Sequence, residues 1–272
     1  MDIVKQALKA VDKIFKPQKS LQFDIVKNKP SIFDCKLGGV PYFPKNMKYP
    51  VGKDSTKDPL GLLIQINFSQ IDHLQNYPKT GILQIFIDRF DCYGMDFDNL
   101  TSQKLFRIIY HKDIITDESQ LIDTLPYEID KSEEMPFTGE YKLVQSNTTT
   151  MYAEPSIEGF EDIFVEEYNK IADTKIDSIF DLEDSVVDSI FHRNESKPIY
   201  LGGYPIFTQN DPRYQKKYQK YDTTLLTIDS YYKKSLGIDL MWGDSGACTF
   251  LMTKDDLKAL NFTKVLYNWD CY

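Results

Sequence analysis

The sequence predicts an α+β fold that is mostly β and internally duplicated. We expect two lobes with antiparallel sheets, an N-terminal helix and a helical acidic connecting segment. One observation is a repeated motif, because residues 37–44 read LGGVPYFP and residues 201–208 read LGGYPIFT. Another is that both copies are followed by the same landmarks in the same order: a leucine pair, a glycine that begins an apolar strand, and a last strand. Landmarks that recur in one order at similar spacing indicate an internal duplication.

The landmarks also set the boundaries of the two copies. The leucine pairs begin at Leu62 and Leu225, and the strand-opening glycines are Gly81 and Gly246. The last strands of the copies cover residues 106–110 and 262–267. We therefore predict a single domain over residues 1–272, with repeat one at about 21–110, the connecting segment at about 111–195 and repeat two at about 196–272.

The first predicted element is an amphipathic helix at the N-terminus. Val4, Leu8 and Val11 recur at helical spacing, and Pro17 ends the pattern because proline cannot continue a helix. Charged residues interrupt the apolar positions, so the segment does not have the pattern of a secretory signal or of a membrane span. We expect a cytoplasmic protein without membrane association.

Short strands follow the helix in repeat one. Alternation and β-branched or aromatic content predict strands at residues 23–26, 62–66, 81–87 and 105–110. The stretch 37–50 is dense in glycine, proline and aromatic residues, which predicts an irregular loop with a tight turn at each Gly-Gly pair. Repeat two is expected to have the same layout between residues 199 and 267.

The connecting segment is rich in acidic residues. Apolar residues fall at helical spacing over 160–171 and again over 176–191, which predicts two amphipathic helices. Their acidic outer faces are ordinary for helices that contact water. A face that binds a basic protein partner is the alternative interpretation.

Composition restricts the classes of function. The net charge is −9 and the sequence pI is about 4.9, so the average field repels phosphate backbones and argues against nucleic acid. The four cysteines are scattered, which indicates free thiols and neither a zinc site nor a disulfide framework. We predict no metal and no cofactor, and the pattern leaves the oligomeric state open.

Polar and tryptophan residues gather in repeat two. We interpret them as the lining of a cleft between the lobes, with the aromatics as anchors and the charged groups as polar contacts. The alternative is structural, with Asx turns capping strand ends and an arginine locking a loop. The candidates are Gln209, Asp211, Arg213, Asp229, Trp242, Asp244 and Trp269.

No motif in the sequence identifies a reaction. The chain has no GxSxG nucleophile elbow, no HExxH helix and no P-loop. A carboxylate pair such as Asp229 and Asp244 would suit a hydrolase, but a chain with 41 acidic residues offers too many pairs for spacing to select one.

Several motifs resemble those of the YwqG-like family of uncharacterised bacterial proteins. They include YGMD at residues 93–96, GGYP at 202–205, WGDSG at 242–246 and YNWDC at 267–271. The resemblance implies a mostly β, duplicated α+β fold and no established activity. Thr227 stands where the family more often has glutamine, opposite Gln65 of repeat one. If that glutamine contacts a ligand, this chain has lost one contact.

Together these observations favour a binding or interaction protein. Its most specific form is an immunity or adaptor protein for a basic partner, because an acidic surface speeds association with such a partner. The alternative is a hydrolase or another enzyme that uses a carboxylate cluster in the cleft.

Overall fold

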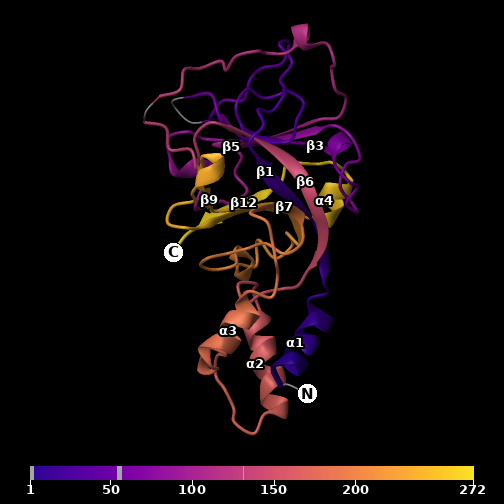
Figure 1. Cartoon of the computed structure of the whole chain (residues 1–272), viewed down its shortest axis with the longest axis vertical. Coiled ribbons are helices and arrows are strands. Elements are labelled where there is room, and N and C mark those ends of the chain that lie inside the picture. Colours follow the sequence, from indigo (N-terminus) through magenta and orange to yellow (C-terminus); the bar gives the residue numbers. More distant parts are fainter. Residues whose placement is uncertain (1–2, 54–56, 131) are drawn as a thin grey trace.

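The centre of the molecule is one curled antiparallel sheet of ten strands (Figure 1). The structure is a computed structural model that describes residues 3–53, 57–130 and 132–272. The strands of repeat one and the segment before it are β1 (Gln18–Val26), β2 (Lys36–Gly38), β3 (Gly61–Asn67), β4 (Ile82–Ile87) and β5 (Phe106–His111). The later strands are β6 (Glu140–Met151), β7 (Ile199–Gly202), β8 (Thr223–Asp229), β11 (Ala247–Met252) and β12 (Leu266–Asp270). A mostly β fold is therefore confirmed.

The order of the strands mirrors the sequence repeat. It runs β12-β11-β8-β7-β1-β6-β2-β3-β4-β5, so each half of the sheet progresses outward in chain order from the central pair β1 and β6. β1 pairs with β7 of repeat two, whereas β6 pairs with β2 of repeat one. The two predicted lobes consequently share one sheet. A common origin of the two halves stays a prediction.

The Gly-Gly pairs occupy the same conformation in both repeats. Gly38 and Gly39 have φ of 59° and 70°, and Gly202 and Gly203 have φ of 68° and 66°. This left-handed region favours glycine. A Cβ on Gly38 would also lie 2.4 Å from the carbonyl oxygen of Gly139. The glycines therefore form the predicted tight turns.

The turns are held by equivalent long side chains. Buried Lys36 donates its Nζ to the carbonyl oxygen of Val40. At the corresponding place in repeat two, the hydroxyl of buried Tyr200 donates to the carbonyl oxygen of Tyr204 over 2.8 Å. Burial lowers the pKa of Lys36 to about 8. Its contacts are those of a structural residue.

A buried polar network attaches the loop after each turn to the sheet. Gln65 accepts from the backbone N–H of Tyr42 over 2.8 Å, and Gln84 donates to the carbonyl oxygen of Tyr42 over 2.6 Å. Gln65 is fully buried, and so is Thr227, which occupies the position where the YwqG-like family more often has glutamine. In repeat two, Thr227 and Thr249 are buried and cross-strand partners, and Thr249 donates to the carbonyl oxygen of Ile206 over 3.3 Å.

His111 belongs to the same network and predicts a pH dependence of stability. Its Nε2 lies 2.9 Å from Gln84 Oε1, and burial lowers the pKa of His111 from 6.5 to about 4. The unfolded chain binds this proton at higher pH than the folded one does. The neutral imidazole therefore makes its full contribution to the free energy of unfolding above about pH 6.5. As the pH falls towards 4, that free energy decreases by about 3 kcal/mol at most. Urea unfolding at several pH values measures the free energy of unfolding of wild type and of His111→Gln. If the difference between these two free energies does not change with pH, the prediction is contradicted.

The two edges of the sheet lie together because the sheet curls. The rings of Phe106 on β5 and Tyr267 on β12 are 5.1 Å apart, and those of Tyr110 and Phe262 are 5.5 Å apart. The backbone N–H of Tyr267 donates to the carbonyl oxygen of Leu100. The segment before β5 thus covers the β12 edge, which would otherwise expose unpaired backbone groups.

Three helices project from one end of the sheet and form what we call the helical unit (Figure 1). They are α1 (Ile3–Ile14), α2 (Phe160–Ile171) and α3 (Asp184–Phe191). The N-terminal helix and the helix at 160–171 are therefore confirmed. The helix expected at 176–191 is shorter than predicted, because residues 179–181 form a separate 3-10 turn. A fourth helix, α4 (Lys254–Lys258), lies beside the sheet. Within the described residues, no helix has the length and apolarity needed to cross a membrane.

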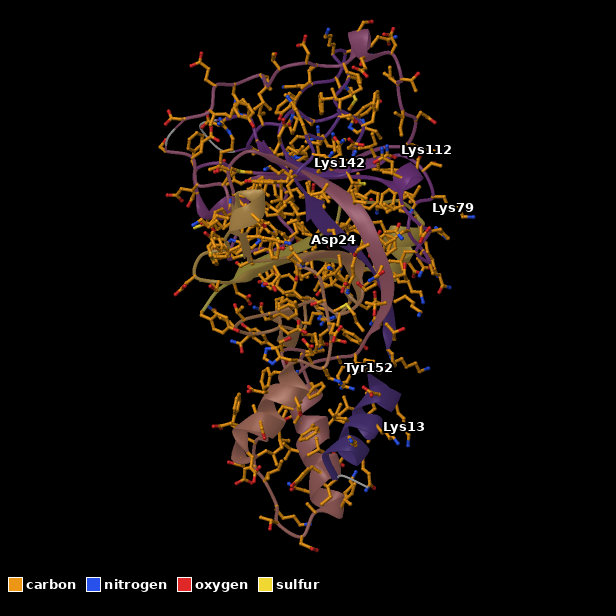
Figure 2. All side chains as sticks on the ribbon, in the orientation of Figure 1. Lys13, Asp24, Lys79, Lys112, Lys142 and Tyr152 are labelled. Carbon is orange, nitrogen blue, oxygen red and sulfur yellow. The ribbon has the colours of Figure 1, made fainter. Side chains whose placement is uncertain are left out.

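One arginine fastens the helical unit to the sheet. Arg193 donates to both carboxylate oxygens of Asp12 at 2.8 Å and to the carbonyl oxygen of Ala153 at 3.1 Å. Its guanidinium also lies 5.0 Å from the ring centroid of Tyr152, at the junction between helices and sheet (Figure 2). This largely buried ion pair joins α1 to the segment after α3, and the contact with Ala153 joins that segment to the chain that follows β6.

The connecting segment was wrongly expected to be only helical. It contains β6, a strand of 12 residues in the middle of the sheet. Its exposed and half-buried positions carry serine, asparagine and three threonines in a row, so it lacks the apolar runs that revealed the other strands. A small hairpin of β9 (Tyr231–Lys233) and β10 (Ile238–Leu240) was also not predicted.

Candidate functional site

Two clefts are lined in part by residues of the helical unit or of its connections to the sheet, and in part by residues of repeat two. We call the first the acidic cleft, because four carboxylates line it and, among the described residues, no lysine or arginine does. Its volume is about 930 Å³. One wall is formed by α3 and the 3-10 turn before it, and the other by residues 206–209 and 229–232. The carboxylates are those of Glu154, Glu161, Asp188 and Asp229.

Asp229 is the most perturbed acid of the cleft. It ends β8, and burial raises its pKa from 3.8 to about 6, although the backbone N–H of Ser230 offsets part of this effect. Asp229 forms no ion pair within the part of the chain that the structure describes. Burial likewise raises the pKa of Glu154, whose Oε1 accepts from Asn194 Nδ2 over 2.8 Å.

Large aromatic side chains stand exposed at the rim of the acidic cleft. Phe180 is 69% exposed, Tyr232 is 65% exposed and Tyr272 is 82% exposed, and all three line the cleft. Aromatic faces attract cations through their electron-rich rings. The rim and the carboxylates therefore suit the same kind of ligand, a cation with an apolar stem.

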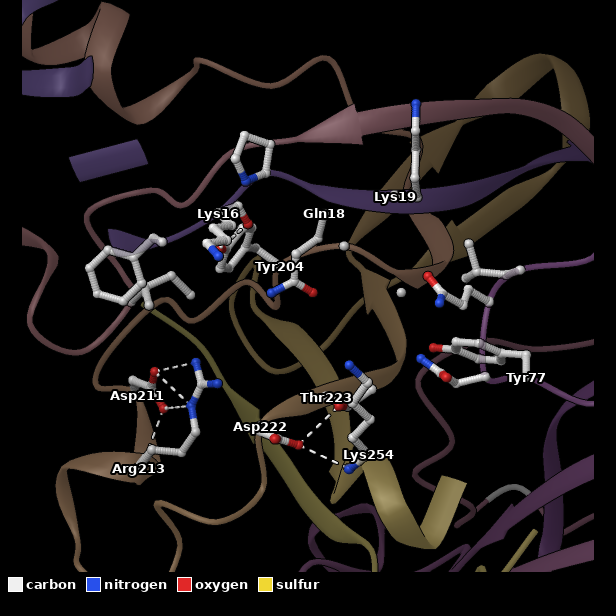
Figure 3. A pocket seen from close by; sticks show the side chains of 18 of the residues that line it. Lys16, Gln18, Lys19, Tyr77, Tyr204, Asp211, Arg213, Asp222, Thr223 and Lys254 are labelled. Carbon is white, nitrogen blue, oxygen red and sulfur yellow. Dashed lines mark hydrogen bonds and ion pairs between the residues drawn. The ribbon is translucent and has the colours of Figure 1, made fainter. Parts of the chain in front are cut away.

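The second cleft lies between the α1–β1 connection and α4, and its volume is about 1110 Å³ (Figure 3). We call it the lysine cleft, because Lys16, Lys19 and Lys254 line it. Asp211 and Arg213 lie in its wall as an ion pair, with Nη2 of Arg213 2.6 Å from Oδ2 of Asp211.

The family of the chain follows from its sequence over this same region. Residues 35–271 match the family described as a domain of unknown function, DUF1963. The chain belongs to this family. No curated protein matches the sequence. The DUF1963 match includes almost all of the acidic cleft, whereas α1 and β1, which supply part of the lysine cleft, precede it.

The site residues that the sequence predicted for this DUF1963 chain do not all lie in one cleft. Gln209 and Asp229 line the acidic cleft, and Asp211 and Arg213 line the lysine cleft. Asp244 is exposed and lines neither. The lysine cleft is lined by residues 73–77 of repeat one as well as by residues of repeat two, whereas the acidic cleft is lined by the connecting segment and repeat two. A binding cleft between the lobes stays a prediction.

The two tryptophans have a structural role. Trp242 is 0% exposed, so the expectation that it anchors a ligand at the surface is wrong. Its ring lies 5.2 Å from that of Tyr93, which in turn lies 4.9 Å from the ring of Trp269. Trp269 donates its Nε1 to the carbonyl oxygen of Cys92 over 2.9 Å. The YGMD, WGDSG and YNWDC motifs thus meet in one aromatic cluster.

Asp211 and Arg213 fit the structural alternative that the sequence offered. Asp211 accepts from the backbone N–H of Arg213 at 3.0 Å and from that of Glu158 at 3.2 Å. The pair therefore fixes the loop before repeat-two strand β8 onto the chain that leads to α2.

Several residues of the acidic cleft were missed. Glu154, Glu161 and Asp188 lie in the connecting segment, whose acidic residues were interpreted as a solvated face or, alternatively, as a surface for a basic partner, and none of the three was named as a site residue. Asp270 was also not singled out, although it accepts from the backbone N–H and the hydroxyl of Thr208 and from the N–H of Gln209. It holds the loop that forms one wall of the cleft. The described residues include no group of three or more His, Cys, Asp or Glu side chains placed to hold a metal ion.

Proposed function

We propose that this DUF1963 protein is a binding protein whose acidic cleft receives a lysine or arginine side chain of a basic protein partner. The observation that supports this most is Asp229, a half-buried carboxylate with a raised pKa, in a cleft lined by three other carboxylates and by no lysine or arginine of the described residues. An ionised carboxylate that is partly withdrawn from water without a cation beside it is unfavourable. A cation supplied by a partner would remove that cost on binding.

The shape of the cleft agrees with a side chain as the ligand. A lysine or arginine has an apolar stem that can pack on Phe180 and Tyr232 while its charged head reaches the carboxylates. The acidic character of the whole chain would steer such a partner towards the site. An immunity or adaptor protein that covers a basic partner in the cytoplasm is the specific form of this proposal, and the resemblance to YwqG-like proteins is compatible with it.

A hexalysine peptide tests the proposal without knowledge of the natural partner. We expect calorimetry to detect binding of hexalysine at about 20 mM salt, and the affinity to fall at least about tenfold at about 200 mM, because salt screens charge attraction. Hexaglutamate is the control and should not bind. Hexalysine that fails to bind at low salt would contradict the proposal.

A hydrolase is the second candidate. Asp229 and Glu154 line one cleft and both have a raised pKa, as a general acid requires near neutral pH. The pair of Asp229 with Asp244 is less suitable, because Asp244 does not line the cleft. Hydrolysis of p-nitrophenyl glycosides or esters that disappears in Asp229→Asn would favour the enzyme, and a panel without turnover would count against it.

A further inference from the structure

We propose that the lysine cleft binds a phosphorylated small molecule, at a site separate from the acidic cleft. Three segments distant in sequence bring cationic groups to it: Lys16 from the α1–β1 connection, Arg213 from the loop before β8, and Lys254 from the first turn of α4. In Figure 3 these side chains and Gln18 surround the same open space, whereas Lys19 points away from it. Nζ of Lys19 donates to Thr150 at 2.8 Å.

The cationic groups keep free hydrogen-bond donors. Arg213 uses Nε and Nη2 to bind Asp211, and its Nη1 has no hydrogen bond to the residues that the structure describes. Lys16 and Lys254 form no ion pair with the described acids. Three donors on separate side chains suit an anion with several oxygens, and phosphate offers such oxygens in several directions.

Two of the three acids that line this cleft already accept hydrogen bonds. Asp211 is paired with Arg213. Asp222 accepts from the backbone N–H of Lys254 at 3.0 Å and from the hydroxyl of Thr223 at 2.9 Å. Glu158 is exposed, and its backbone N–H donates to Asp211. The positive charges of Lys16 and Lys254 are therefore available to a ligand. In the acidic cleft, by contrast, no lysine or arginine is among the lining residues that the structure describes.

Neutral donors complete the lining. Gln18 points into the cleft from β1, and Gln75, Asn76 and Gln219 lie around it. A volume of about 1110 Å³ admits a ligand larger than a single phosphate ion. The ligand class is therefore a phosphorylated small molecule whose phosphate contacts Lys16, Lys254 and Arg213 and whose body contacts the amides.

Inorganic pyrophosphate is the probe that tests this site. We expect calorimetry on the intact protein to detect pyrophosphate binding, with affinity reduced about tenfold in Lys16→Gln and in Lys254→Gln, because each substitution removes a charge-assisted hydrogen bond to the phosphate. Lys264→Gln removes an exposed lysine outside the cleft and should leave the affinity unchanged. Melting temperatures establish that all three variants fold.

Three outcomes would overturn the proposal. One is absence of pyrophosphate binding at millimolar concentration. Another is an equal loss of affinity in Lys264→Gln, because this would indicate general charge attraction. The last is citrate binding as tightly as pyrophosphate, because citrate carries comparable charge on carboxylates. The test does not involve the acidic cleft, so its result is independent of the proposed function.

Discussion

Replacing Asp229 by asparagine is expected to stabilise the protein and to weaken its binding of hexalysine at the same time. The folded pKa of Asp229, about 6, lies above the ordinary value of 3.8. The neutral acid therefore makes its full contribution to the free energy of unfolding below about pH 4. This contribution is lost as the pH rises through about 6. At pH 7.5 the ionised carboxylate destabilises the fold by roughly 1 to 3 kcal/mol, which Asp229→Asn should recover.

The same substitution should weaken hexalysine binding by about tenfold or more, because it removes a charge-assisted contact of about 1.5 to 3 kcal/mol. Chemical denaturation at pH 7.5 and at pH 4 measures the stability, and calorimetry measures the affinity. A gain in stability without loss of affinity would contradict a binding role for Asp229. A loss of stability at pH 7.5 would contradict its burial as an uncompensated charge.

The largest loss of stability is expected for Gly246→Ala. A Cβ at this position would lie 1.8 Å from the carbonyl oxygen of Asp270, so β11 and β12 would have to separate where the WGDSG motif enters the sheet. Overpacking of this kind destabilises by roughly 3 kcal/mol or more. The equivalent glycine of repeat one, Gly81, would place a Cβ 2.6 Å from the carbonyl oxygen of His111, and Gly81→Ala should have a similar effect.

Gly237→Ala is the matched control for these changes. Gly237 has φ of 67°, but nothing lies within 4 Å of a Cβ built there. Its substitution should lower the free energy of unfolding by only about 1 kcal/mol, because alanine is less stable than glycine in the left-handed conformation. Urea denaturation curves of the three variants measure the free energy of unfolding. Equal losses in Gly246→Ala and Gly237→Ala would show that the contact with Asp270 is unimportant.

Much of the fold could be predicted because its signals are local. Helical spacing before Pro17 predicted α1, and apolar runs predicted the strands beginning near Leu62 and Gly81. β6 was missed because its outward positions are polar and its stability comes from pairing with β1 and β2 on both sides. Such long-range pairing leaves little trace in local composition.

The candidate site was harder to predict, because a cleft depends on which surfaces meet. Asp229 and Gln209 were found because polar residues gather in repeat two, whereas Glu161 and Asp188 become part of the same cleft only when the helical unit is placed against repeat two. Trp242 was misassigned because tryptophan serves equally well as a surface anchor and as a core residue. Its burial follows from the packing of Tyr93 and Trp269, which are distant in sequence.

The most direct test of a cation-binding acidic cleft compares two double variants with the same net charge. Asp188→Asn with Asp229→Asn removes two carboxylates of the cleft, and Asp123→Asn with Glu128→Gln removes two exposed carboxylates elsewhere. Calorimetry of hexalysine binding at about 20 mM salt, where screening is weak, is the measurement. We predict that the cleft variant loses at least about tenfold in affinity while the control stays within about twofold. Equal losses in both variants would contradict the account, because binding would then follow overall charge and not the cleft.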